Sequence, residues 1–209
     1  MSLEIVSLRS LLEQMDEEDI LRDILFLFES KDCEGTHSSK DIKAFLQNKS
    51  KAINFEKQGI SRTYLVFYNE ENFSYLAGYF SIANKNLQIS ENNFNRLAKS
   101  KQRLFQEIGY KSDKKNFISP AILLGQFGKN FNVPEGLESH QIVNGNDLMA
   151  SAIEVIKEAY NLIGGKVLYL ECEDHKKLTG FYERHGFVKL EITKQEDELL
   201  IYMKKLSRI

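Results

Sequence analysis

The strongest constraint on the fold comes from one long helical stripe that lies between two apolar runs. Hydrophobic residues recur at helical spacing, at Leu148, Ala152, Val155, Ile156, Ala159 and Ile163. Gly164 and Gly165 end this helix, and the apolar run Val167–Leu170 follows as a short strand. Before the helix, Phe117–Phe127 is predicted as a buried strand, and Gly125 within it indicates a bulge or a close approach of a ligand. A strand–helix–strand unit predicts two parallel strands joined by a right-handed crossover.

The C-terminal part continues the same alternation. Leu178–Arg184 is predicted as a short helix closed by Gly186. Phe187–Thr193 and Leu199–Leu206 then form a predicted hairpin around Lys194–Asp197. The C-terminal order is therefore strand, helix, strand, helix, strand, strand.

The N-terminal part adds helices and an antiparallel pair of strands. Arg62–Tyr68 and Tyr75–Ala83 are rich in β-branched and aromatic residues and flank a polar turn, which predicts two antiparallel strands. Helical spacing is found from Leu8 to Met15 and from Ile42 to Glu56, whereas Ile20–Phe28 fits either a strand or a buried helix. Residues 84–117 are predicted as a helical excursion from a single domain that covers residues 1–209.

Composition excludes several classes of protein. The chain has 209 residues, of which 42% are hydrophobic, as expected for a globular protein. Its formal net charge of -2 argues against a general polyanion binder. Cys33 and Cys172 have no metal-ligand spacing, so we expect free thiols, no metal site and a cytoplasmic location. No segment approaches the roughly 18 apolar residues of a membrane span, and no secretion signal is recognisable, so no membrane association is expected.

A glycine-containing turn before the long helix is the first candidate for chemistry. Asn144, Gly145 and Asn146 suit a turn whose backbone N–H groups, with the positive end of the helix dipole, could hold a pyrophosphate. A glycine before a helix is more often an ordinary connection. The sequence contains neither GxGxxG nor GxxxxGK[ST], which argues against Rossmann and P-loop sites.

The second candidate is the segment Leu178–Phe187. Its aromatic pair, Phe181 and Tyr182, precedes Gly186, which ends the helix before a strand. From single residues alone, core packing explains these aromatic side chains better than catalysis does.

The combination of these segments resembles the GNAT family of N-acetyltransferases. The family has an acyl-CoA strand, a pyrophosphate loop and helix, another strand, and a helix that ends in an [LF]YE..GF motif. This chain has Ile122–Phe127, Gly145–Met149, Val167–Glu171 and Phe181–Phe187 in the same order. The resemblance is strongest from about Phe117 to the C-terminus.

The resemblance implies a mixed, mostly antiparallel twisted α/β sheet flanked by helices, with a splayed pair of parallel strands that admits acetyl-CoA. The pantetheine arm would pair with backbone on the first strand, at Leu123, Leu124, Gly125, Gln126 and Phe127. The pyrophosphate would lie on Val143, Asn144, Gly145 and Asn146, and Phe181 would also contact the cosubstrate. In the family's [QR]xxGx[GA] loop, the last small residue aligns with Gly145 and the earlier positions with His140 and Val143. Valine and a longer loop are departures from the family pattern.

The resemblance also assigns a catalytic residue. The Tyr of the [LF]YE motif falls on Tyr182, which would protonate the departing CoA thiolate, a role that fits general acid catalysis. A backbone N–H near Phe127 would stabilise the oxyanion. Glu171 and Glu173 are candidates for the general base, whereas the neutral Gln126 is not. The four histidines, at 37, 140, 175 and 185, show no ligand-like spacing.

Three functions are compatible with the sequence. The first is transfer of an acetyl group from acetyl-CoA to an amine, with the acceptor set by residues 29–56, 84–117 and 130–144. The second is a CoA-binding pseudoenzyme or regulatory module. The third is a toxin-type acetyltransferase that acts on aminoacyl-tRNA and is held by an antitoxin-like protein partner. Cys33, Asp41–Leu46 and Ser61–Leu65 resemble that branch, whereas the net charge argues against nucleic-acid binding. A homodimer is also compatible with the resemblance.

Overall fold

A computed structural model describes residues 2–32, 36–48, 51–71, 73–113, 115–137, 141–191 and 199–209. Cys33, His140 and the turn Lys194–Asp197 lie outside the described residues. The chain divides into two units, residues 1–83 with 125–155 and residues 84–124 with 156–209. Neither unit is a continuous stretch of chain, and the single domain predicted from the sequence stays a prediction.

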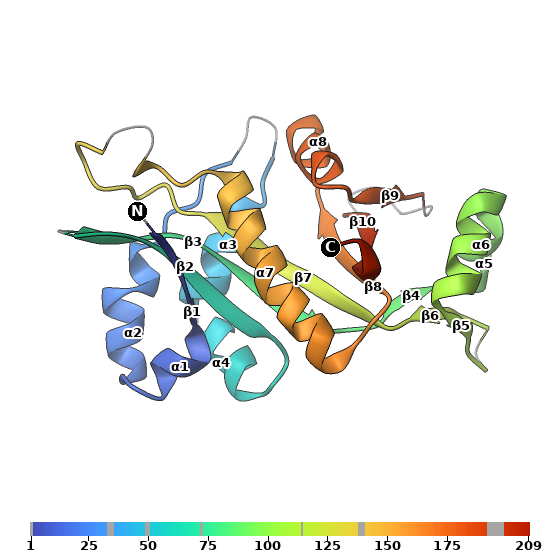
Figure 1. Cartoon of the computed structure of the whole chain (residues 1–209), viewed down its shortest axis with the longest axis horizontal. Helices are drawn as coiled ribbons and strands as arrows, with labels where there is room; N and C mark the ends of the chain where they lie inside the picture. Colours follow the sequence, from blue (N-terminus) through green and yellow to red (C-terminus); the bar gives the residue numbers. More distant parts are fainter. Residues whose placement is uncertain are drawn as a thin grey trace. The chain divides into compact units, whose positions relative to one another are not determined.

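Figure 1 colours the helices and strands in chain order, from blue at the N-terminus to red at the C-terminus. The N-terminal elements are β1 (Ser2–Ser7), α1 (Leu8–Leu12), α2 (Glu17–Asp23), the 3-10 helix η1 (Leu25–Leu27), α3 (Ser39–Gln47), α4 (Lys51–Lys57), β2 (Arg62–Glu70) and β3 (Phe73–Asn84). The middle elements are β4 (Leu87–Ile89), α5 (Glu91–Arg96), α6 (Lys99–Ile108), β5 (Tyr110–Lys111), β6 (Phe117–Ser119) and β7 (Ala121–Lys129). The C-terminal elements are α7 (Gly145–Ile163), β8 (Val167–Cys172), α8 (Lys176–Arg184), β9 (Val188–Leu190), β10 (Leu200–Lys205) and the 3-10 helix η4 (Leu206–Arg208).

The main sheet is mixed and mostly antiparallel, as the sequence predicts. Its seven strands follow the order β1-β2-β3-β7-β8-β10-β9. The pairs β1/β2, β2/β3, β8/β10 and β9/β10 are antiparallel, and β7 and β8 form a parallel pair. The parallel pair confirms that the predicted helical stripe, α7, connects two parallel strands.

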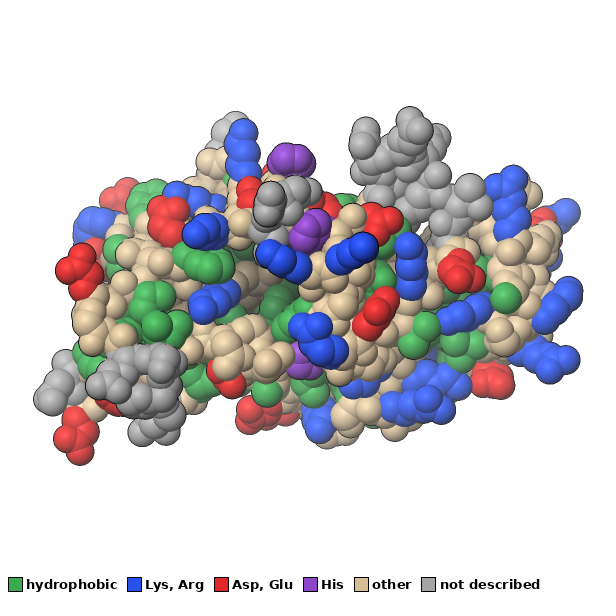
Figure 2. All heavy atoms as spheres, turned by 90° about the horizontal axis from the view of Figure 1, so that it is seen from above, with side chains coloured by type: hydrophobic (Ala, Val, Ile, Leu, Met, Phe, Trp, Pro, Cys, Tyr) green, Lys and Arg blue, Asp and Glu red, His purple; other side chains and the backbone are tan. Residues whose placement is uncertain are grey.

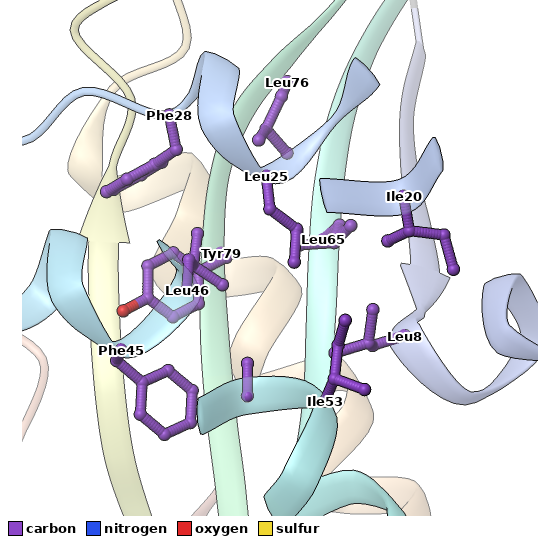
Figure 3. Packing of buried hydrophobic residues seen from close by; sticks show 11 residues of the cluster. Leu8, Ile20, Leu25, Phe28, Phe45, Leu46, Ile53, Leu65, Leu76 and Tyr79 are labelled. Carbon is purple, nitrogen blue, oxygen red and sulfur yellow. The ribbon is translucent and has the colours of Figure 1, made fainter. Parts of the chain in front are cut away.

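The core of the first unit lies between the short N-terminal helices and one face of β2 and β3 (Figure 3). Leu65 and Tyr79, both fully buried, are the strand residues at its centre. Gly128 allows α3 to approach β7 closely, because a Cβ at this position would lie 2.6 Å from Cγ2 of Ile42. Gly78 has a similar role toward α7, since its Cβ would lie 2.7 Å from Cδ1 of Leu148.

The second unit contains a small module with its own core. A three-stranded sheet of order β4-β6-β5 supports α5 and α6, and the rings of Phe94 and Phe117 stack with centroids 3.7 Å apart. Apolar residues of this module pack with Val167, Tyr169 and Met203 of β8 and β10. The predicted helical excursion over 84–117 is therefore found, together with a sheet that was not predicted.

One strand was missed, and three local predictions need correction or refinement. Strand β1 was not predicted, because its six residues alternate between polar and apolar only from Ser2 to Ile5. Ile20–Phe28 is helical, in α2 and η1, and the predicted helix over 42–56 is divided between α3 and α4. The predicted strand Phe117–Phe127 is interrupted at Pro120, which has no backbone N–H for a ladder and separates β6 from β7.

Within the described ranges, no helix is both long and apolar enough to cross a membrane.

Candidate functional site

Strand β7 carries the residues expected to meet the pantetheine arm. Leu124 is buried, Leu123, Gln126 and Phe127 are half-buried, and Gly125 is exposed. The register with β8 runs from Ala121 to Leu123, whereas β7 itself continues to Lys129. The parallel ladder therefore ends where the resemblance places the pantetheine amides.

Side chains of the first unit hold the second half of this strand. The Tyr79 hydroxyl donates to the carbonyl of Ile42 at 2.6 Å and lies 3.4 Å from Oε1 of Gln126. Tyr79 thus connects α3, β3 and β7 through one buried phenol.

Asn130 fixes the chain just beyond β7, and the sequence analysis missed it. It is 2% exposed, and its Nδ2 donates to the carbonyl of Leu76 at 2.7 Å. Its Oδ1 accepts from the backbone N–H groups of Glu29, at 2.8 Å, and Asn132, at 3.0 Å. An asparagine after a strand looks like any loop residue in a sequence, so no pattern would have revealed this clamp.

The N-terminus of α7 is closed by its own side chains. Oδ1 of Asn144 accepts from the N–H groups of Asn146, at 2.8 Å, and Asp147, at 3.3 Å. Oδ2 of Asp147 accepts in return from the N–H of Asn144 at 3.0 Å. This reciprocal capping box satisfies N–H groups that a helix otherwise leaves without an internal partner. A pyrophosphate at this end would compete with Asn144 and Asp147 for the same donors.

The loop before α7 is anchored to β3 through Tyr75. The Tyr75 hydroxyl donates to the carbonyl of Gln141 at 2.9 Å and accepts from the N–H of Val143 at 3.2 Å. Val143 is 5% exposed, so the valine that departs from the family pattern is an apolar anchor for the loop. Gly145 lies in α7 and is not among the glycines with positive φ, so its backbone needs no left-handed conformation.

In the second unit, α8 ends in a Schellman motif that places Tyr182. The N–H of Phe187 donates to the carbonyl of Tyr182 at 3.1 Å, and the N–H of Gly186 donates to the carbonyl of Glu183 at 2.9 Å. Gly186 has a φ of 80°, the left-handed conformation that this helix end requires. The rings of Tyr182 and Phe187 meet with centroids 6.0 Å apart, which is the apolar contact that accompanies the motif. The glycine and the second phenylalanine of the motif thus have a structural reason.

Tyr182 is buried among aromatic rings. It is 8% exposed and contacts Phe181 at 5.3 Å and Tyr202 at 6.4 Å between ring centroids. Burial raises the pKa of the Tyr182 hydroxyl well above that of a free tyrosine, and Cys172 at the end of β8 adds to the shift. A tyrosine phenol is already protonated at neutral pH, and burial adds to this preference. Among the residues that the structure describes, its hydroxyl has no hydrogen-bond partner.

Lys204 of β10 supports the end of α8. Its Nζ donates to the carbonyl of His185 at 3.0 Å, and its side chain passes 3.5 Å from the position of a Cβ on Gly186. Burial lowers the pKa of His185, and the charges of Lys204 and Arg184 lower it further. A cation at the C-terminus of a helix interacts favourably with its last carbonyls.

The candidates for the general base and two of the histidines lie near the ends of their elements or on the surface. Glu171 is exposed and Glu173 is half-buried, both at the end of β8 or just beyond it. His175 precedes α8 and makes no side-chain cap, and His37 is exposed. Within the described part of the chain, no cluster of His, Cys, Asp and Glu could hold a metal ion.

Comparison with known proteins links this geometry to one fold. Neither a protein-family model nor a curated protein matches the sequence. Solved structures do match over the full length. A Tyr-to-Phe mutant of KacT has a TM-score of 0.61 and 18% identity, and the match covers 100% of this chain and 97% of that one.

Two structures of the AtaT toxin are similarly close. AtaT complexed with acetyl-methionyl-tRNAfMet has a TM-score of 0.59 and 19% identity, covering 99% of this chain and 96% of that one. A Tyr-to-Phe mutant of AtaT, bound to the C-terminus of the antitoxin AtaR and acetyl-CoA, has a TM-score of 0.58 and 17% identity. That match covers 100% of this chain and 96% of that one. At these identities the likeness concerns the fold. The chain therefore has the GNAT-like fold that the AtaT toxin and KacT share.

Proposed function

We propose that this protein transfers an acetyl group from acetyl-CoA to an amine acceptor, with Tyr182 as the general acid. The observation that carries the proposal is the place of Tyr182 in the last turn of α8, where the Schellman motif and the ring of Phe187 fix its buried phenol. It occupies the position of the [LF]YE tyrosine in a chain with a GNAT-like fold.

The chemistry requires one proton donor and one proton acceptor. The amine attacks the thioester carbonyl, a C–N bond forms, and the C–S bond of the tetrahedral intermediate then breaks. Tyr182 gives its proton to the departing sulfur, and the attacking nitrogen loses a proton to a base. Glu171 and Glu173 are the candidates for this base, since carboxylates at the end of β8 are accessible to solvent.

The residues for acetyl-CoA follow the same resemblance. Backbone groups of β7 at Leu123–Phe127 would pair with the pantetheine amides, and this is supported by the end of the β7/β8 ladder at Leu123. The N-terminus of α7 at Asn144–Asn146 would bind the pyrophosphate once the Asn144 side chain and the Asp147 carboxylate release the helix N–H groups. Val143 and Phe181 are the other residues that the resemblance assigns to acetyl-CoA.

The test is a screen of amine acceptors in which release of free CoA thiol is followed. Turnover with any acceptor that is lost in Tyr182→Phe supports the proposal. Saturable binding of acetyl-CoA without turnover on any amine, including aminoacyl-tRNA, would favour a CoA-binding regulatory module instead.

Aminoacyl-tRNA is the second candidate for the acceptor. The net charge of -2 is unevenly divided, because the second unit holds 18 Lys and Arg against 12 Asp and Glu, and the first holds 10 against 18. A basic half removes the objection that overall charge raises against a nucleic-acid substrate. The acidic first unit is compatible with binding of a regulatory protein partner of the antitoxin kind. Acetylation of the amino group of charged tRNA, compared with the free aminoacyl ester, tests this candidate.

A further inference from the structure

The most basic part of the protein is the module built from residues 84–117. Eight Lys and Arg stand against three Asp and Glu in this segment, whereas the rest of the chain is acidic. Four of these cations, Arg96, Lys99, Lys101 and Arg103, lie within eight consecutive residues that contain no acidic side chain. This density of positive charge is typical of a surface that meets a polyanion.

The module is folded around its own core, so the cations have defined positions. Phe94, Phe105 and Ile108 are buried, and α5 is joined to α6 by a tight connection. Nε2 of Gln102 donates to the carbonyls of Phe94 at 3.1 Å and Leu97 at 3.0 Å. One amide side chain thus fixes the turn on which the basic segment lies.

The cations of this segment are available to an external ligand. Arg96, Lys99 and Arg103 are exposed, and Lys101 is half-buried. Within the described residues none of the four forms an ion pair, and Lys99 donates only to the neutral amide of Gln102, at 3.3 Å. Lys and Arg side chains gather in the right-hand part of Figure 2, over the region of α5, α6 and β5.

Helix stability does not explain these charges. The first turn of α6 contains Lys99 and Lys101 and no acidic residue, and Ala98 provides no side-chain cap. Cations at this end oppose the helix dipole, so local folding would favour the reverse pattern. A charge arrangement that weakens its own helix indicates a role in binding.

An exposed aromatic residue follows the basic helix. Tyr110 in β5 is 56% exposed and precedes Lys111, which pairs with Glu91 at 2.5 Å. A base that is not held in a duplex can stack on such a ring, and this contact is largely independent of sequence.

We propose that the 84–117 module binds an unpaired stretch of RNA, with Arg96, Lys99, Lys101 and Arg103 on phosphates and Tyr110 against a base. The binding goes beyond acetyl transfer and needs neither acetyl-CoA nor Tyr182. Bidentate and point-charge contacts of Arg and Lys supply the affinity, and the aromatic ring selects unstacked bases over a closed duplex.

The experiment measures binding of a labelled, unstructured RNA to the full chain by fluorescence anisotropy over a series of salt concentrations, without acetyl-CoA. The test variant carries Lys99→Gln, Lys101→Gln and Arg103→Gln. The control carries Lys31→Gln, Lys40→Gln and Lys51→Gln, which removes the same charge from three exposed positions of the first unit. Circular dichroism and urea unfolding check that both variants fold.

The proposal predicts that the dissociation constant for RNA rises at least about tenfold in the test variant. The slope of the logarithm of the binding constant against the logarithm of the salt concentration should become less steep by about 2. The control is expected to match the wild type. Tyr110→Ala is expected to lose several-fold in affinity while its salt slope is unchanged. Equal losses in the two triple variants, absence of RNA binding at low salt, or tighter binding of duplex DNA would each overturn the proposal. Absence of RNA binding would also count against aminoacyl-tRNA as the acceptor, whereas acetyl transfer to other amines is read separately from thiol release.

Discussion

Replacement of Tyr182 by phenylalanine separates the catalytic role of its hydroxyl from the packing of its ring. The aromatic contacts with Phe181, Phe187 and Tyr202 remain in the variant, and the lost hydroxyl leaves no described hydrogen-bond partner behind. We therefore expect a change of less than about 1 kcal/mol in the free energy of unfolding. General acid catalysis contributes about 10²- to 10⁴-fold in rate, so kcat should fall by that factor, or roughly 3–5 kcal/mol of transition-state stabilisation.

The assay follows thiol release at saturating acetyl-CoA and acceptor, and calorimetry gives the dissociation constant of acetyl-CoA. A fall in kcat with unchanged acetyl-CoA affinity is the signature of an interaction made only in the transition state. Tyr182→Ala is the contrasting variant, since loss of the buried ring should cost about 3–5 kcal/mol of stability. Wild-type turnover in the phenylalanine variant would refute the reasoning and return Tyr182 to a packing role.

Three further predictions follow from the site. Gly145→Val should raise the dissociation constant of CoA by on the order of tenfold, because its side chain would lie at the phosphate position, and should lower the free energy of unfolding by less than about 1 kcal/mol. Equal weakening of the binding of a pantetheine without phosphates would contradict a pyrophosphate site. Asp147→Asn removes a negative charge from the N-terminus of α7, so titration calorimetry should show acetyl-CoA binding about 2- to 5-fold tighter, and weaker binding would argue against phosphates there. The pKa of Tyr182 is raised from 10.0 by burial, so its contribution to stability is fully present below about pH 10 and is lost as pH rises toward the folded pKa. Urea unfolding should therefore show a smaller alkaline loss of stability in Tyr182→Phe than in the wild type, and equal losses would exclude a raised pKa.

Periodicity was sufficient for the long elements of the fold. The stripe from Leu148 to Ile163 defines α7, and its position between two apolar runs was enough to predict the parallel pair β7/β8. Short elements escaped because they depend on tertiary partners. Strand β1 exists through its ladder with β2, and the small β4-β6-β5 sheet supports helices that the sequence did show.

The candidate site was predictable where a motif has a local physical cause. Gly186 and Phe187 follow Tyr182 because a Schellman motif needs a left-handed residue and an apolar contact, so the pattern carries its geometry with it. Long-range contacts leave no such trace. Asn130 and Tyr75 bond to groups more than 50 residues away, and neither shows a pattern in its own neighbourhood.

Calorimetric titration with acetyl-CoA, combined with unfolding curves, tests the central claim of an acetyl-CoA-dependent transferase most directly. The proposal predicts saturable binding of one acetyl-CoA per chain and a stabilisation of about 2.7 kcal/mol when the ligand is present at about 100 times its dissociation constant. A titration without binding heat, together with an unfolding curve that a saturating dose leaves unmoved, would contradict the claim.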